Sequence, residues 1–173
     1  MAAVAARLAV VAVAAVAGAG EMPAQDRSSP DLLFVYGTLR PSLIDAAPET
    51  PRQIVRALRV QGEATVAGLL FDLGDYPGFV RATPSIGGGA QAGSPRVVGD
   101  VLEVDASDLA ALDAYEECGG PSPLYRRERV LATWRSGGEP FTCWIYVACG
   151  DLSKRPAIPQ GDFAAHLRSR RDA

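Results

Sequence analysis

The chain has 173 residues, 48% of them hydrophobic, and this length and composition suit one compact domain with a sizeable core. Its formal charge of -3 and sequence pI near 5.2 argue against nucleic-acid binding, which usually requires a basic face. One histidine and three widely spaced cysteines predict neither a metal-ligand cluster nor a histidine-based catalytic triad.

The first 20 residues, MAAVAARLAVVAVAAVAGAG, differ in kind from the rest of the chain. Arg7 precedes an apolar run at 8–16, and small residues follow at 17–19, as in a secretory signal peptide. The run is shorter than the roughly 20 residues of a membrane span, so we expect no stable span in the mature chain. We expect export to the periplasm or the medium; the alternative is an alanine-rich leader on a cytoplasmic protein.

Residues 21–30, EMPAQDRSSP, are polar and contain proline, which predicts a linker before a single domain at 31–173. Export would place the cysteines in an oxidising compartment. Cys143 and Cys149 stand at the two ends of one predicted strand, too far apart to bridge each other. Cys118 could pair with either of them, and buried free cysteines are at least as compatible with the sequence.

Several segments have the hydrophobic patterns of β-strands. Residues 32–36 are apolar on both faces, as in a central strand. The segments 125–134 and 141–148 alternate in hydrophobicity and are joined by RSGGEP, which predicts a hairpin. Further strands are expected at 58–73, at 97–104 and, after a turn, within 75–84.

One helix is well marked, after the strand at 97–104. Asp105 or Ser107 is its expected N-cap, and it should end near Cys118 because GGPSP cannot continue it. Another short helix is expected at 161–170. The segment 41–56 is predicted as a loop that can hold one short helix, and composition predicts a flexible loop at 85–96. Together these elements indicate a strand-rich α+β domain.

The predicted helix, DASDLAALDAYEECGG, carries a carboxylate on its apolar side. At about 100° per residue, Leu109, Leu112 and Glu116 fall on one narrow stripe. Glu117 points away from this stripe, and Asp113 lies on its flank. A core-facing carboxylate is costly unless paired, solvated or protonated, and burial raises its pKa toward neutrality. Glu116 is therefore a candidate for proton transfer; alternatively, it lies at a frayed helix end and reaches water.

The buried run LLFV ends in YGTL, at residues 36–39. Gly37 has no Cβ and allows the backbone to approach a ligand closely, and Thr38 adds a hydroxyl. Backbone N–H groups in such a turn can hold a carboxylate or phosphate. Taken alone, a Gly-Thr pair after a strand usually marks no more than a turn.

Five blocks follow one another along the chain: FVYGTLRPS, YPGFV, VVGDVLEVDASDLAALDAYEE, LYRRERV and CWIYV. In this order they resemble the gamma-glutamylcyclotransferase-like family, most of all its gamma-glutamylamine cyclotransferase branch and bacterial relatives. The resemblance covers about residues 32–163. It implies an α+β fold with a compact, mixed, partly barrel-like β-sheet and one main helix.

Carried over by motif, the resemblance implies that Tyr36, Gly37, Thr38 and Leu39 form a substrate-binding loop. Its backbone and hydroxyl groups would hold the α-carboxylate and α-amino ends of a small gamma-glutamyl substrate. Glu116, in LDAYE, matches the family's catalytic general acid/base. Many relatives have a glycine directly after this residue, whereas here a second glutamate follows.

Tyr125, in LYRR, matches a tyrosine that tends to line the same pocket, and Pro77 and Gly78 match a YPG turn that helps to close the cavity. Some of these side chains also have a plain structural interpretation. The ring of Tyr36 can cap the core, the hydroxyl of Thr38 can bond locally, and Tyr125 can simply pack in the sheet.

Arginines flank these motifs, and we expect most of them at the surface. Arg40, directly after the loop, is predicted to be a solvated surface side chain rather than a contact to a substrate carboxylate. Arg126, Arg127 and Arg129 alternate along a strand, so at most one face of them can reach a pocket.

The activity implied by the resemblance is an intramolecular aminolysis that gives 5-oxoproline and a free amine or amino acid, without metal or cofactor. Two alternatives remain: a non-catalytic binding module that uses the same cavity, and an acyltransferase or deprotecting enzyme acting on a larger gamma-glutamyl substrate. The sequence selects neither the leaving amine nor an oligomeric state.

Overall fold

The computed structural model describes residues 30–82 and 94–172. The predicted leader at 1–20, nearly all of the linker at 21–30 and most of the loop at 85–96 lie outside the described residues, so they stay predictions. In the part of the chain that is described, no helix has both the length and the apolar character to cross a membrane.

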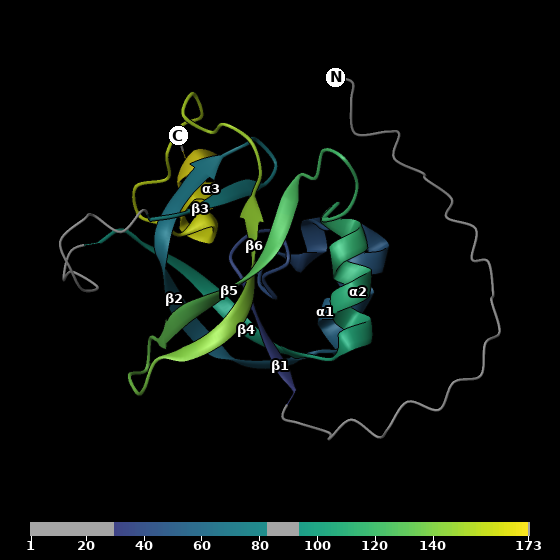
Figure 1. The fold of residues 1–173 in the computed structure, drawn as a ribbon. Helices are drawn as coiled ribbons and strands as arrows, with labels where there is room; N and C mark the ends of the chain where they lie inside the picture. Colours follow the sequence, from purple (N-terminus) through teal and green to yellow (C-terminus); the bar gives the residue numbers. More distant parts are fainter. Residues whose placement is uncertain (1–29, 83–93, 173) are drawn as a thin grey trace, which may run out of the picture.

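Six strands form one mixed sheet in the order β3-β2-β4-β1-β6-β5, and β5 also pairs with β2. Their bounds are Asp31–Val35 for β1, Arg59–Asp72 for β2, Pro77–Arg81 for β3, Arg96–Val104 for β4, Tyr125–Trp134 for β5 and Phe141–Ala148 for β6. The extra pairing closes all strands except β3 into a barrel (Figure 1). The expected α+β fold with a partly barrel-like mixed sheet is confirmed.

The long strand β2 makes this closure possible. Its first part pairs with β4, its middle also pairs with β5, and its end pairs with β3. The register with β4 shifts between Val60 and Gly62, as at a β-bulge. Such a bulge increases the local twist and bend of a strand, which favours closure.

Strand β1 lies at the centre of the sheet, antiparallel to β4 and parallel to β6. Phe34 faces the barrel interior, whereas Leu33 and Val35 face a second core outside the barrel. The prediction of a strand buried on both faces is confirmed, because successive side chains enter different cores.

Helices α1 (Glu49–Ala57) and α2 (Ala106–Tyr115) lie side by side against the outside of the barrel (Figure 1). Leu109 and Leu112 of α2 and Val55 of α1 are buried there with the outward side chains of β1 and β4. Helix α3 (Phe163–Arg171) lies near β3, and its Phe163 is buried in the barrel core. A short 3-10 helix, η1 (Ile44–Ala46), precedes α1.

Helix α2 begins at the predicted cap. The Asp105 carboxylate accepts hydrogen bonds from the backbone N–H groups of Ser107 and Asp108, and Asp108 completes a capping box. The helix ends at Tyr115, slightly before the predicted Cys118. The hairpin of β5 and β6 has the predicted bounds, and α1 occupies the segment where one short helix was considered.

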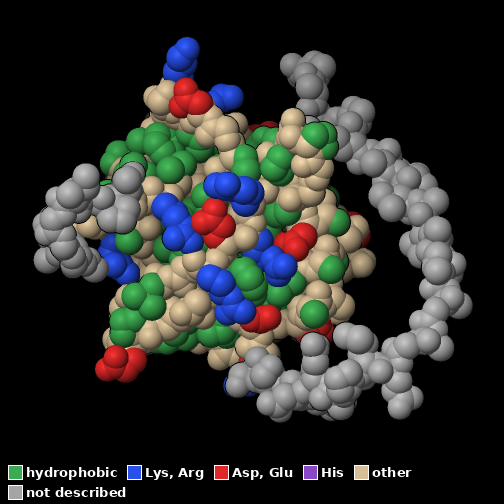
Figure 2. Space-filling model, viewed as in Figure 1, with side chains coloured by type: hydrophobic (Ala, Val, Ile, Leu, Met, Phe, Trp, Pro, Cys, Tyr) green, Lys and Arg blue, Asp and Glu red, His purple; other side chains and the backbone are tan. Residues whose placement is uncertain are grey.

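The face seen in Figure 2 carries side chains of both signs, interleaved rather than gathered into one patch. On or beside β5, Arg81 and Arg126 pair with Glu128, and Arg129 pairs with Asp31. This face therefore lacks the uniform positive charge that nucleic-acid binding proteins use.

The close approach of β4 to β1 gives a test of the fold. A Cβ at Gly99 would lie 2.4 Å from the Val35 carbonyl oxygen and 2.6 Å from the Phe34 ring. We expect Gly99→Ala to lower the free energy of unfolding by about 1–3 kcal/mol, as overpacking does. Gly119 has nothing within 4 Å of its would-be Cβ, so Gly119→Ala is the matched control. Urea unfolding measures both, and equal effects would contradict the packing described.

Candidate active site

The YGTL loop, residues 36–39, leaves the carboxyl end of β1 and is held by its first and last side chains. The Tyr36 hydroxyl donates to the Tyr146 carbonyl oxygen at 2.7 Å, and its ring packs on Phe79 in the barrel core. Leu39 is buried in the outer core. The structural interpretation of the Tyr36 ring is therefore correct, and the backbone around Gly37 and the side chain of Thr38 remain half-buried.

Pro77 and Gly78 are predicted to form a turn, but they are the first two residues of β3, paired with the end of β2, and they lie directly against this loop. A Cβ at Gly37 would come within 2.9 Å of the Pro77 ring, so only glycine allows this contact without a shift. The Tyr125 hydroxyl donates to the Pro77 carbonyl oxygen at 2.9 Å. Gly78 packs beside Leu152. Residues predicted from three separate motifs thus meet at one end of the barrel, and Tyr125 has the packing role considered for it.

Glu116 is the C-cap residue of α2 and is half-buried. Burial raises its pKa from the ordinary value of 4.5 to about 7. This shift is in the direction expected for a carboxyl group on the buried side of the helix rather than one fully in water. A carboxyl group with this pKa can both accept and donate a proton near neutral pH.

Glu116 lies within electrostatic reach of the loop and of Tyr125. The pKa values of Tyr36, Tyr115 and Tyr125 are raised by burial and, in addition, by the negative charge of Glu116. Tyr146 feels the same charge, after burial and the nearby Asp113. The charge of Glu116 is thus felt by tyrosines of the YGTL loop, α2, β5 and β6.

Sequence reasoning missed Tyr115 and Tyr146 as neighbours of this carboxylate. Burial and the charge of Glu116 raise the pKa of Tyr115, while a hydrogen bond with Thr38 acts to lower this pKa. That bond links the YGTL loop to the residue directly before Glu116. The sequence did contain one indication of the position of Tyr146. In the CWIYV block it stands two positions after Trp144, so both side chains lie on the strand face that points toward α2.

The backbone after α2 fixes the position of Glu116. Glu117 has a φ of 52°, in the left-handed region. The N–H of Glu117 bonds the Ala114 carbonyl, and the N–H of Cys118 bonds the Asp113 carbonyl. These two bonds form a Schellman motif, whose left-handed position is usually glycine. A glycine would suit this backbone, and Glu117 adopts the same conformation.

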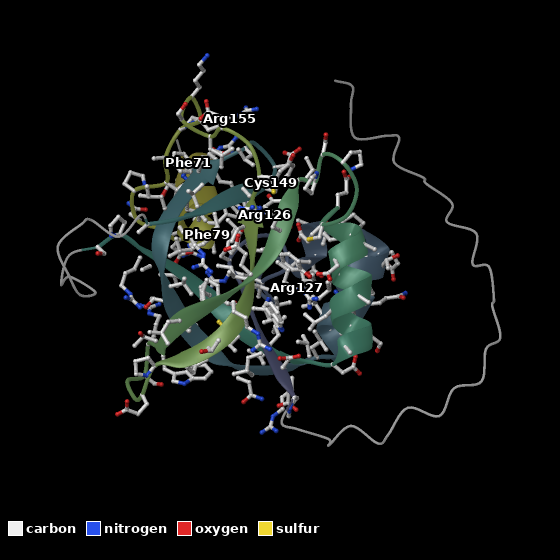
Figure 3. The ribbon with its side chains drawn as sticks, viewed as in Figure 1. Phe71, Phe79, Arg126, Arg127, Cys149 and Arg155 are labelled. Atoms are coloured by element: carbon white, nitrogen blue, oxygen red, sulfur yellow. The ribbon has the colours of Figure 1, made fainter. Side chains whose placement is uncertain are left out.

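A second polar cluster lies one helical turn before Glu116. Asp113 accepts a hydrogen bond from the Tyr146 hydroxyl at 2.9 Å and pairs with Arg127 at 3.2 Å. Arg127 lies between β5 and α2 (Figure 3), with its guanidinium 4.6 Å from the centre of the Trp144 ring. Its charge is engaged by Asp113, so the pKa of Glu116 is set by burial. Arg126, on the other strand face, is exposed as predicted.

The prediction that Arg40 is a solvated surface side chain is wrong. Arg40 is 4% exposed and forms ion pairs with Glu63, Asp100 and Asp162. This arrangement could not be predicted from the local sequence, because the three acids come from distant parts of the chain.

All three cysteines are free; Cys143 is buried, as the alternative of buried free cysteines expected, whereas Cys118 and Cys149 are half-buried. Burial raises the pKa of the Cys118 thiol to about 12. A thiol with such a pKa is a poor nucleophile at neutral pH. Within residues 30–82 and 94–172, no group of three or more histidine, cysteine or acidic side chains is placed to hold a metal ion.

The raised pKa of Glu116 has a consequence for stability. The folded state holds the Glu116 proton more tightly than the unfolded state, so ionisation costs stability as pH rises from about 4.5 to about 7. Glu116→Gln removes this cost, and we expect the variant to exceed wild type by at most about 3 kcal/mol at pH 8 and by little at pH 4. Urea unfolding at the two pH values measures the difference. A pH-independent difference would show that the carboxyl group is not desolvated.

Comparison with known proteins finds relatives of this sequence. A family model described as gamma-glutamyl cyclotransferase, AIG2-like, matches residues 33–165. A Vibrio cholerae protein described as "Putative gamma-glutamylcyclotransferase" is 30% identical over 137 residues, which cover 79% of this chain and 97% of that protein.

Two solved structures are similar in fold. YkqA from Bacillus subtilis has a TM-score of 0.58 and 23% identity; the match covers 83% of this chain but 43% of YkqA, so the chain spans less than half of that protein. An AIG2-like protein from Mus musculus has a TM-score of 0.52 and 21% identity, over 70% of this chain and 78% of that protein. The family match spans most of the sequence, and the chain belongs to the gamma-glutamyl cyclotransferase, AIG2-like family.

Proposed function

We propose that the protein is a gamma-glutamyl cyclotransferase that converts a gamma-glutamyl amine or peptide into 5-oxoproline and a free amine. Membership of the family supports gamma-glutamyl cyclotransferase-like activity in general. The observation that carries the specific reaction is Glu116, a half-buried carboxyl group with a pKa raised to about 7, placed beside the YGTL loop. Such a group suits a reaction that needs proton transfer and no protein nucleophile.

The YGTL loop is the proposed binding site of the glutamyl group. Its side chains at Tyr36 and Leu39 are buried, so the backbone between them is fixed before a substrate arrives. Backbone N–H groups of Gly37 and Thr38 suit an α-carboxylate. Pro77 and Tyr125, joined by a hydrogen bond, form the neighbouring wall. Preorganisation of this kind lowers the entropic cost of holding the substrate in a reactive conformation.

In the proposed reaction Glu116 carries two protons, one after the other, away from the attacking nitrogen. The carboxylate accepts a proton from the substrate's α-ammonium group, and the freed amine nitrogen attacks the γ-carbonyl carbon. A new C–N bond closes the five-membered ring and gives a tetrahedral intermediate. Protonated Glu116 then gives this proton to the leaving nitrogen as the original C–N bond breaks. The regenerated carboxylate takes the second proton from the ring nitrogen, which leaves the neutral lactam, and passes it to the released amine, which departs as an ammonium ion. A pKa near neutrality serves both steps.

Negative charge develops on the γ-carbonyl oxygen in the tetrahedral intermediate. Backbone N–H groups of the loop are the proposed donors to this oxyanion, since fixed donors in a water-poor site stabilise such charge strongly. The tethered amine supplies much of the rate by proximity. These two contributions and the proton transfer require no cofactor chemistry.

The first test is product formation. The full-length protein is incubated with a panel of gamma-glutamyl amines and dipeptides, and 5-oxoproline is detected by mass spectrometry. We expect product from wild type and at least a roughly 100-fold loss for Glu116→Gln, because general acid/base groups contribute about that much or more. Glu117→Gln, at the adjacent exposed glutamate, is the matched control and should keep its activity.

The outcomes of this assay separate the alternatives. Equal product from wild type and Glu116→Gln would exclude the proposed role of Glu116. No product from a folded wild type that still binds a gamma-glutamyl compound would indicate the non-catalytic binding module. Transfer of the glutamyl or another acyl group to a second molecule, without 5-oxoproline, would indicate the acyltransferase.

The pH dependence is a second test. The base form of Glu116 is required for attack, so kcat/KM should rise with pH, about tenfold per unit below the pKa, and level off above about 7. Steady-state rates between pH 5 and pH 8 on one active substrate measure this profile. An inflection near 4.5, the ordinary glutamate value, would contradict a buried acid/base at this position.

A further inference from the structure

We infer that Arg40 is a positioning residue for the gamma-glutamyl-binding loop, holding the Gly37–Thr38 backbone at its place opposite Glu116 without touching the substrate. The inference rests on the proposed function, because it assigns to Arg40 the geometry of the loop that would bind the glutamyl group. It replaces both earlier interpretations of this side chain, the solvated arginine and the contact to a substrate carboxylate.

The backbone of Arg40 joins two successive turns. Its N–H donates to the Gly37 carbonyl oxygen at 2.9 Å and so closes the turn that contains Thr38. Its own carbonyl oxygen accepts a hydrogen bond from the N–H of Leu43 at 2.8 Å. A displacement of Arg40 would therefore also move the Gly37 carbonyl group, to which its N–H is hydrogen-bonded.

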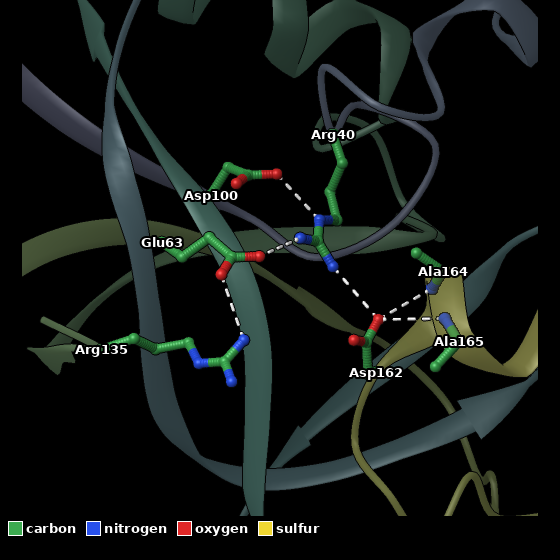
Figure 4. A network of polar contacts seen from close by, with 7 residues as sticks. All are labelled: Arg40, Glu63, Asp100, Arg135, Asp162, Ala164 and Ala165. Atoms are coloured by element: carbon green, nitrogen blue, oxygen red, sulfur yellow. Dashed lines mark hydrogen bonds and ion pairs between the residues drawn. The ribbon is translucent and has the colours of Figure 1, made fainter.

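The side chain of Arg40 is held by three carboxylates from three elements (Figure 4). Nε donates to Asp100 on β4 at 2.8 Å, Nη2 to Glu63 on β2 at 3.1 Å, and Nη1 to Asp162, the N-cap of α3, at 3.1 Å. A planar guanidinium can donate along three directions at once, whereas a lysine ammonium acts as a point charge. All three guanidinium nitrogens are thus engaged away from the proposed substrate.

The carboxylates are themselves held in place. Asp100 lies opposite Val35, the last residue of β1, so the ion pair is made to the strand beside the start of the loop. Asp162 accepts two further bonds from the backbone of α3, and Glu63 also pairs with Arg135 at 3.1 Å. The guanidinium is therefore anchored to fixed partners, as Figure 4 shows.

On the side away from Arg40, contacts with Pro77 and Tyr115 also restrict the position of the loop backbone. The backbone at Gly37 touches the Pro77 ring, and the Thr38 hydroxyl bonds Tyr115, the residue before Glu116. With Arg40 these contacts fix the loop at three points. A displacement of the order of 1 Å in such a site can lower the reaction rate by about 100-fold. Loss of the Arg40 contacts should therefore weaken glutamyl binding even where the fold survives.

The test uses Arg40→Lys in the full-length protein. Binding of L-glutamate, as a probe of the glutamyl site, is measured by calorimetry, and kcat and KM are measured on a gamma-glutamyl compound that wild type converts. We expect the Kd for L-glutamate and the KM each to rise at least about 10-fold. The inflection of kcat/KM near pH 7 should stay where it is, because Glu116 keeps its surroundings.

Arg129→Lys is the matched control, since it makes the same exchange in an exposed pair with Asp31 at the other end of β1. Its Kd and KM should equal those of wild type. Arg40→Met alone would leave Asp100 buried without a partner, a change that can unfold a protein. The double variant Arg40→Met with Asp100→Asn removes both charges, and we expect it to fold and to show the same loss of binding.

Each result bears on a definite claim. A folded Arg40→Lys or double variant with wild-type Kd and KM, whatever its melting temperature, would reduce Arg40 to a structural role and overturn the inference. A shifted pH inflection in these variants would also overturn it, since Arg40 would then act on Glu116. If wild type neither binds L-glutamate nor forms 5-oxoproline, the proposed function fails, and the inference fails with it.

Discussion

The site depends on the position of β1 between two cores. Its side chains alternate between the barrel interior and the layer beneath α1 and α2, so the strand cannot slide by one residue without exposing apolar groups on both sides. Because β4 and β6 pair with its two edges, its carboxyl end is fixed as well. The YGTL loop starts from that fixed end, and α2 packs on the outward side chains of the same strand. Loop and carboxylate thus take their relative placement from one element.

Charge is distributed unevenly around the loop. On one side, burial raises the pKa of Glu116, and its negative charge raises the pKa of the neighbouring Tyr115. On the other, Arg40 is surrounded by three acids, and these raise its pKa against the effect of burial. Arg127 pairs with Asp113 rather than with Glu116. Within the described part of the chain, Arg40 and Arg127 are both paired with acids, whereas no ion pair engages Glu116.

Much of this arrangement could be predicted from the sequence, because local patterns carry it. Alternation of polar and apolar residues predicted β5 and β6, and the capping residue Asp105 predicted the start of α2. Helical periodicity placed Glu116 on the apolar side of that helix. What failed depends on long-range pairing. Arg40 follows a turn and has the appearance of a surface residue, and its acids lie at positions 63, 100 and 162. The approach of Tyr146 to Glu116 likewise requires the pairing of β6 with β1 and the packing of α2 on the sheet, which no short stretch of sequence encodes.

The C-cap position of Glu116 has an electrostatic effect of its own. Peptide dipoles along a helix give its carboxyl end a partial negative charge of about half an electron, which disfavours a carboxylate there. This field acts in the same direction as burial, so the group can hold its proton near neutral pH while remaining only half-buried. A glutamate deep in a core would need a narrow channel to reach its substrate. At the end of α2, the same acidity is reached without full burial of the carboxyl group.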